Sequence, residues 1–253
     1  MSELLVTNGM SVTFGGLRAV NAVDFTVEEG KLVGLIGPNG AGKTTFIDGI
    51  TGFVPTSGSI RFLGEEISDE PAHQRARRGL GRTWQSLELF EDLSIEENLL
   101  VAAEDQSALG FLADLVWPTR RRGHDNVNFA LDVLGIRDLA KRTPNEISQG
   151  QRKLVSAARA LAARPRLVCM DEPAAGLDTS ESRELGLRLR QIVDAGITVF
   201  LVDHDMGLVL SVCDFIYVIE FGATIAQGTP DEVQRNPRVI EAYLGSSATG
   251  HEA

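Results

Sequence analysis

The sequence has no long apolar run. No stretch approaches the roughly 20 consecutive apolar residues that a helix needs to cross a bilayer. Residues 1–5 lack the basic and apolar segments of a secretory signal. We therefore expect a chain that neither spans the membrane nor is exported. Its 253 residues are enough to bury a full core, either as one α/β domain with a subdomain or as two domains.

Cysteine and histidine are scarce. The two cysteines, Cys169 and Cys213, both lie in apolar runs. This excludes a disulfide framework and predicts small core residues in a reducing compartment. The four histidines lie without the spacing that metal ligands show. They are His73, His124, His204 and His251.

Basic residues are in deficit. The 24 lysines and arginines are outnumbered by 35 aspartates and glutamates, and the net charge is -11. With a pI of about 4.9, this balance argues against a broad nucleic-acid-binding surface, although a local basic patch can exist on an acidic chain. Two arginine clusters are interpreted either as solvated faces or as contacts with an acidic or anionic membrane partner. The clusters are Arg75, Arg77, Arg78 and Arg82, and Arg120, Arg121 and Arg122.

A glycine-rich segment fits the phosphate-binding pattern G-x-x-x-x-G-K-[ST] at every fixed position. Its glycines leave room for backbone amides to approach phosphate oxygens. Lys43 would supply a charge to the β- and γ-phosphates, and the Thr44 hydroxyl would bind Mg²⁺. An apolar strand over 31–36 and a helix over 45–50 flank the loop, which predicts a nucleoside-triphosphate site rather than a turn that binds nothing. The segment reads Gly37-Pro38-Asn39-Gly40-Ala41-Gly42-Lys43-Thr44.

The periodicity along the chain predicts an α/β fold. Alternating apolar residues over 4–27, with a turn at Gly15-Gly16, predict antiparallel strands, and residues 56–64 predict a further hairpin. The pattern is helical between about 86 and 161, where Ser94 and Glu97 form a capping box. Within this region, weak periodicity over 106–128 predicts an insertion of helix pieces and loop.

Three apolar strands follow, separated by segments compatible with helices. They cover residues 167–170, 197–202 and 215–219. This alternation predicts a parallel sheet. We expect a single domain over 1–245, with a helical subdomain at about 86–161, and a disordered tail over 246–253.

Two carboxylates follow the strand over 167–170. Ligands bind at the carboxyl ends of strands in open α/β sheets. Asp171 can therefore hold Mg²⁺, and Glu172 can orient or deprotonate a water. The alternative is that both residues cap the next helix.

His204 follows another strand and should emerge at the same edge of the sheet. It is interpreted either as a structural residue or as a donor to the γ-phosphate. Ser148 begins a helix as its N-cap, and the free amides there form a second anion site.

The order of these motifs resembles the ATPase subunit of an ABC transporter over nearly the whole chain. The motifs are the phosphate-binding loop, Gln85, Ser148-Gln149-Gly150-Gln151, Asp171-Glu172, Gly176-Leu177-Asp178 and His204. The resemblance implies a P-loop ATPase with a parallel-sheet core, an antiparallel β subdomain and a helical subdomain. It also implies ATP and Mg²⁺ as cofactors.

The resemblance assigns roles to individual residues. Phe14 would stack on adenine with Val20 nearby, although from its pattern Phe14 is equally a core strand residue. Gln85 would sense Mg²⁺ and the attacking water, and Glu172, His204 and Gln85 would be catalytic. The other nucleotide contacts would be Gly37, Pro38, Asn39, Gly40, Ala41, Gly42, Lys43, Thr44 and Thr45, and the Mg²⁺ ligands would be Thr44, Gln85 and Asp171.

Further contacts would come from a second subunit. Ser148 and Gly150 would contact the γ-phosphate of ATP held by the opposite chain, Gln151 would be a further nucleotide-binding residue, and Asp178 would lie at the dimer interface. Two ATP molecules would thus lie between two such subunits. Gln149 departs from the glycine that most of the family carries, which puts in doubt how closely that helix start approaches the partner's nucleotide.

The chain is most similar to the longer ATPase of branched-chain amino acid importers. The likeness rests on residues 97–102 with the insertion after them, 171–177, 204–206 and the tail over 228–245. It implies a dimer with a second ATPase, as a heterodimer or alternatively a homodimer, on membrane permease subunits at the cytoplasmic face of the cell membrane. An extracytoplasmic binding protein would serve it indirectly. Alternatives are a urea or amide importer, a lipid or lipopolysaccharide exporter, a non-transport ABC ATPase acting on nucleic acid, and a switch GTPase. The sequence has no Asn-Lys-x-Asp segment to support the GTPase.

Overall fold

The core of the molecule is a six-stranded sheet in the order β10-β9-β3-β8-β7-β6. The computed structural model describes residues 2–84, 89–103 and 120–248, and the side chains of these except 120–122 and 244–248. Five strands of this sheet run parallel, and β10 pairs antiparallel with β9 at one edge. The strands are β3 (Leu32–Ile36), β6 (Leu80–Arg82), β7 (Leu167–Asp171), β8 (Thr198–Val202), β9 (Phe215–Glu220) and β10 (Ala223–Gly228).

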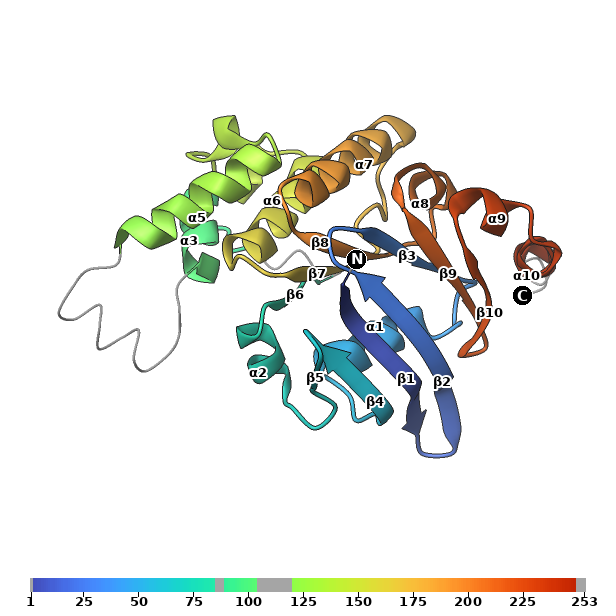
Figure 1. The fold of residues 1–253 in the computed structure, drawn as a ribbon. Coiled ribbons are helices and arrows are strands. Elements are labelled where there is room, and N and C mark those ends of the chain that lie inside the picture. Colours follow the sequence, from blue (N-terminus) through green and yellow to red (C-terminus); the bar gives the residue numbers. More distant parts are fainter. Residues whose placement is uncertain (1, 85–88, 104–119, 249–253) are drawn as a thin grey trace.

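A second sheet of four antiparallel strands lies on one side of the core sheet, in the order β2-β1-β4-β5, and the helices α3, α5, α6 and α7 lie on the other side (Figure 1). The strands of this second sheet are β1 (Glu3–Phe14), β2 (Leu17–Glu28), β4 (Ser57–Phe62) and β5 (Glu65–Glu66). The helices are α1 (Lys43–Thr51), α2 (Ala72–Arg77), α3 (Ile95–Ala103), α5 (Arg120–Val133), η1 (Arg137–Leu139), η2 (Pro144–Glu146), α6 (Gln149–Ala162), α7 (Thr179–Asp194), α8 (Met206–Val212), α9 (Pro230–Gln234) and α10 (Pro237–Ala248).

The core sheet buries both faces, because alternate residues of a strand point to opposite sides. In β3, Leu32 and Ile36 join the core on the helical side, whereas Val33 and Leu35 join the core that faces the antiparallel sheet. On this second side α1 fills the space between the sheets. The Phe25 ring of β2 lies 5.1 Å from the Phe46 ring of α1 and 4.8 Å from the Phe200 ring of β8, measured between centroids.

The predicted α/β class with a parallel core and an antiparallel sheet is therefore confirmed. The capping box is also confirmed, since the backbone N–H of Ser94 donates to the Glu97 carboxylate at 2.8 Å just before α3. The C-terminal part of the expected insertion belongs to α5, and α10 continues to Ala248. The limits of the domain, of its helical subdomain and of a disordered tail stay predictions.

The structure confirms the prediction for the two cysteines but not the whole prediction for the first arginine cluster. Both cysteines are buried and free, and burial raises the pKa of the Cys169 thiol to about 12. The interpretation of the first arginine cluster as a solvated face is wrong for Arg75, which is 2% exposed, and for Arg82, whose side chain is 7% exposed. Among the described residues, no helix combines the length and apolarity that crossing a bilayer requires.

Candidate functional site

The glycine-rich loop connects β3 to α1, and backbone carbonyl oxygens of β9 and β2 pack closely against it. A Cβ atom at Gly37 would lie 2.2 Å from the Ile219 carbonyl oxygen of β9, and one at Gly42 would lie 2.4 Å from the Ala19 carbonyl oxygen of β2. Gly42 also has a φ of 100°, in the left-handed region that favours glycine. The loop therefore needs glycine at these two positions to reach its observed shape.

Lys43, the first residue of α1, is almost completely buried at 6% exposure. Its Nζ donates hydrogen bonds to the carbonyl oxygens of Gly37 at 2.8 Å and Pro38 at 3.1 Å, inside the loop. Burial lowers the pKa of Lys43, and the nearby charges of Glu172 and Asp171 oppose that shift. The positive charge of Lys43 thus lies inside the loop at the N-terminus of α1. The positive end of the helix dipole lies at the same place, so both favour the binding of an anion.

Thr44 and Asp171 come together although 127 positions separate them. The Thr44 Oγ1 donates to Asp171 Oδ1 at 3.5 Å. Burial raises the pKa of Asp171, and the charge of Arg82 opposes this, with its Nη2 at 3.6 Å from Asp171 Oδ2. A hydroxyl and a carboxylate at this separation suit Mg²⁺, which takes oxygen ligands and is usually held by few protein groups together with substrate phosphates. Across the described residues, no group of three or more His, Cys, Asp or Glu side chains could hold a metal ion by itself.

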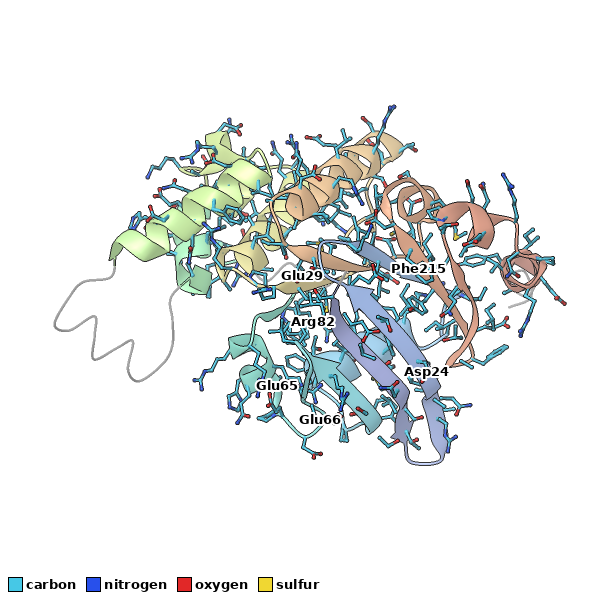
Figure 2. All side chains as sticks on the ribbon, viewed as in Figure 1. Asp24, Glu29, Glu65, Glu66, Arg82 and Phe215 are labelled. Carbon is cyan, nitrogen blue, oxygen red and sulfur yellow. The ribbon has the colours of Figure 1, made fainter. Side chains whose placement is uncertain are left out.

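Arg82 connects this site to the rest of the core, and it lies near the centre of the molecule (Figure 2). Its Nη1 donates to Asp48 Oδ1 of α1 at 2.5 Å, and its guanidinium stacks on Trp84 with 4.4 Å between its central carbon and the ring centroid. Gln85, the residue expected to contact Mg²⁺ and water, lies outside the described residues.

Glu172 and His204 emerge side by side at the ends of β7 and β8. His204 Nδ1 lies 3.7 Å from Glu172 Oε2. Glu172 adopts a φ of 48°, unusual for a residue with a side chain, and its N–H donates to the Val202 carbonyl at 2.7 Å. Strained backbone of this kind concentrates at functional sites, since surrounding structure must hold it in place. The hydrogen bond to Val202 supplies that constraint here.

Asp203 is a residue that the sequence pattern marks only by its position before His204. It is completely buried, and its two oxygens accept hydrogen bonds from the N–H groups of Ala174 and Asp205, each at 3.0 Å. One carboxylate thus joins the turn after β7 to the turn after β8. Its buried charge also opposes the burial-driven lowering of the Lys43 pKa.

Lys153 of α6 also approaches these acids, which its sequence position did not indicate. It lines a crevice of about 20 Å³ together with Asp171 and Glu172. Burial lowers the pKa of Lys153, and the charges of Asp203 and Glu172 oppose this. The only sequence signal was a basic residue five positions after Ser148.

The predicted second anion site lies elsewhere. Ser148 is the N-cap of α6, as predicted, with its Oγ accepting from the Gln151 N–H at 3.2 Å. Ser148, Gly150 and Gln151 line a hollow of about 310 Å³ whose lining includes no residue of the glycine-rich loop. Asp178 caps α7, accepting from the N–H groups two and three residues later at 2.8 and 2.9 Å. Neither these cap hydrogen bonds nor the lining of the hollow connects the four residues to the loop of the same chain.

Phe14 and Val20 lie on the β1–β2 hairpin. Phe14 is 49% exposed, which contradicts the alternative that it is a core residue. Val20 is completely buried, so its side chain packs in the core. Contact of either residue with a base stays a prediction.

Comparison with known proteins identifies the family. A model of the ABC transporter family matches residues 20–175, and one of the branched-chain amino acid ATP-binding cassette transporter family matches residues 223–249. The chain is 42% identical to the high-affinity branched-chain amino acid transport ATP-binding protein BraF of Pseudomonas aeruginosa over 251 residues, covering 96% of this chain and 98% of BraF. It is 38% identical to LivG of Escherichia coli K12, of the same description, with the same coverage.

Other similar proteins are described by other roles or by their fold alone. The lipopolysaccharide export system ATP-binding protein LptB of Escherichia coli K12 is 34% identical, with 95% of this chain and 97% of LptB covered. The ADP conformation of MJ1267, an ATP-binding cassette of an ABC transporter, superposes with a TM-score of 0.86 at 31% identity, covering 97% of this chain and all of MJ1267 (100%). Since both the family model and relatives above 30% identity cover most of the chain, it belongs to the ABC transporter family as an ATP-binding, ATP-hydrolysing subunit.

Proposed function

We propose that this chain couples ATP binding and hydrolysis to the uptake of branched-chain or related amino acids through a membrane permease. The observation that carries the ATPase part is the convergence of Lys43, Thr44, Asp171 and Glu172 at the carboxyl ends of β3 and β7. Ligand sites in open α/β sheets lie at this edge. The cation, hydroxyl and carboxylates there match what phosphoryl transfer needs.

Each of these residues has a proposed role. The loop amides and Lys43 bind the phosphates. Thr44, Asp171 and Gln85 would hold Mg²⁺, which would supply positive charge to offset that of the phosphates. Glu172 orients or deprotonates the attacking water, and His204, 3.7 Å from it, donates to the γ-phosphate. Catalysis then rests mainly on positioning and electrostatics.

The hydrolytic site is proposed to need a second ATPase. Ser148, Gly150 and Gln151 line a hollow to which the loop of their own chain contributes no residue, which supports a role toward ATP held by the opposite subunit. Asp178 is proposed to lie at the dimer interface. The free amides at the start of α6 suit a γ-phosphate. We propose a dimer with a second ATPase, docked on permease subunits at the cytoplasmic face of the membrane and served by an extracytoplasmic binding protein.

The cargo is proposed from the relatives. Two of the similar proteins, at 42% and 38% identity, are described as branched-chain amino acid transport proteins, and the C-terminal match over 223–249 is of the same type. LptB, at 34%, supports lipid or lipopolysaccharide export as the second candidate. The cargo does not touch this subunit, so the test is the ligand of the binding protein that works with the same permease. Tight binding of leucine, isoleucine or valine supports import of these amino acids, whereas export would need no such binding protein.

The substitution Glu172→Gln tests the ATPase mechanism. It keeps the size and the hydrogen-bonding capacity of the side chain but removes the negative charge that would orient and deprotonate water. We expect ATP binding to be retained, turnover to be lost and an ATP-bound dimer to persist, as measured by phosphate release and size-exclusion chromatography. Glu241→Gln, at an exposed position of α10, is the control and should hydrolyse ATP normally. Near-normal hydrolysis by Glu172→Gln would show that Glu172 is not the catalytic carboxylate.

A further inference from the structure

The turn between β9 and β10 carries an exposed aromatic residue in an unfavourable conformation. Glu220 pairs with Ala223, so Phe221 and Gly222 form a two-residue hairpin loop, with φ angles of 48° and 78°. Positive φ at both positions defines a type I′ turn, which prefers Asn, Asp or Gly at the first position. Phe221 stands there instead and is 87% exposed. Both its conformation and its exposure therefore disfavour phenylalanine for stability alone.

This turn is bound directly to the nucleotide-binding loop. The Gly222 N–H donates to the Ala41 carbonyl at 2.9 Å, and the Gly222 carbonyl accepts from the Asn21 N–H at 2.8 Å. A Cβ atom at Gly222 would lie 2.6 Å from the Ala19 carbonyl oxygen, the same oxygen that excludes a side chain at Gly42. The backbone next to Phe221 is therefore fixed relative to the loop.

The second exposed aromatic near this place is Phe14. Phe14 pairs with Leu17 at the start of β2, while Gly222 is held against Ala19 and Asn21 a few residues further along the same strand. The two exposed rings thus border one short segment of β2, beside the loop that binds phosphate. An aromatic ring at either end of this segment is placed to contact the nucleoside part of a bound nucleotide.

A second hairpin provides an internal comparison. Leu63 and Gly64 join β4 to β5 with φ angles of 55° and 79°, the same turn geometry with an apolar residue at the same position. Leu63 is only 44% exposed, and its N–H donates to Leu4 rather than to a residue of the nucleotide loop. An apolar residue in such a turn is therefore no evidence of a site by itself. What distinguishes Phe221 is its exposure and its fixed place next to Ala41.

We propose that Phe221 is an additional nucleotide-binding residue, which packs against the purine nucleoside of the ATP whose phosphates the glycine-rich loop holds. The inference depends on ATP binding at that loop. Stacking on an aromatic ring suits any base, so Phe221 raises affinity for nucleotides in general and leaves the phosphate contacts unchanged. Its contribution is therefore absent for a ligand that has phosphates but no nucleoside.

The test compares ATP with inorganic tripolyphosphate, both with Mg²⁺, on the full chain by isothermal titration calorimetry. For Phe221→Asn we expect the Kd for ATP to rise about five- to tenfold and the Kd for tripolyphosphate to stay unchanged. Asn suits the type I′ turn, so the variant should fold and its melting temperature should not fall. Phe221→Tyr keeps the ring and should keep the wild-type affinity. Leu63→Asn, the same change in the matched turn, should leave both affinities unchanged.

Three results would overturn the proposal. The first is an unchanged ATP affinity in Phe221→Asn, which would be the outcome if the ring contacted a partner subunit instead. The second is an equal loss for ATP and tripolyphosphate, which would mean that the turn only supports the shape of the loop. The third is a wild-type chain that binds neither ligand, which would overturn the ATPase assignment as well, whereas the first two leave that assignment intact.

Discussion

Replacing Arg75 with methionine tests whether a buried cation at the far end of α1 holds the nucleotide-binding helix in place. Arg75 lies in α2 and donates four hydrogen bonds, all to backbone carbonyls. They go to Gly49 at 2.8 Å, Ile50 at 2.7 Å, Ser68 at 2.7 Å and Glu70 at 2.8 Å. Two of these carbonyls belong to the last turn of α1, where intrahelical partners run out. The positive charge also complements the negative end of the helix dipole.

The magnitude follows from the number of groups left without a partner. A hydrogen bond to a charged group contributes about 1.5–3 kcal/mol, and a buried carbonyl without a donor costs about 1–3 kcal/mol. The Gly49 carbonyl keeps a second donor, the Gly52 N–H at 3.2 Å, and methionine fills much of the space of the arginine. We therefore expect Arg75→Met to lower the free energy of unfolding by about 3–5 kcal/mol, because the carbonyls of Ile50, Ser68 and Glu70 lose their charged donor.

Urea unfolding followed by circular dichroism measures this loss as a lower midpoint at an unchanged slope. Arg77→Met, on the same helix but at an exposed position, is the matched control and should change stability by no more than about 0.5 kcal/mol. A loss below about 1 kcal/mol in Arg75→Met, or an equal loss in both variants, would refute the reasoning. Arg75 would then be no more important than a surface arginine.

Three further predictions concern the loop, a helix cap and pH. Gly37→Ala should raise the Kd for ATP more than about tenfold with the helix content unchanged, because the new Cβ would meet a backbone carbonyl at 2.2 Å; an unchanged Kd by fluorescence titration would contradict this. Ser148→Ala removes the cap of α6 and should cost about 1 kcal/mol in urea unfolding, and a loss near zero would mean that the free amides find another acceptor. Burial raises the pKa of Glu66, but hydrogen bonds from two serines and the backbone outweigh this and lower it from 4.5 to about 2. Because the folded pKa is lowered, this carboxylate stabilises the fold above pH 4.5, and that contribution is lost as the pH falls toward 2. Glu66→Gln, at the half-exposed site on β5 visible in Figure 2, should weaken that part of the pH dependence of the unfolding free energy, and an identical pH profile would contradict the assignment.

Sequence alone determined the features that depend on short-range physics. A phosphate-binding loop needs glycines and a lysine at fixed spacing within one short segment, so its position from Gly37 to Thr44 could be predicted. The same holds for the caps at Ser94 and Ser148, which need only a hydroxyl and a partner three residues later. Alternation of apolar strands with helices was enough to predict the parallel core, because a strand buried on both faces must be apolar throughout.

Other features depend on segments that meet only in the folded chain. Arg75 and Arg82 have the composition of a surface cluster, and nothing in the sequence shows that backbone carbonyls and two carboxylates would surround them. Asp203 becomes a bridge between two strand ends because β7 and β8 are neighbours. Phe221 lies 180 positions after Ala41, and only the pairing of β9 with β3 brings its turn against the nucleotide loop. Local pattern thus determined which residues could perform the chemistry, whereas tertiary packing decided which distant groups surround them, because contacts between strands are set by sheet order and not by distance along the chain.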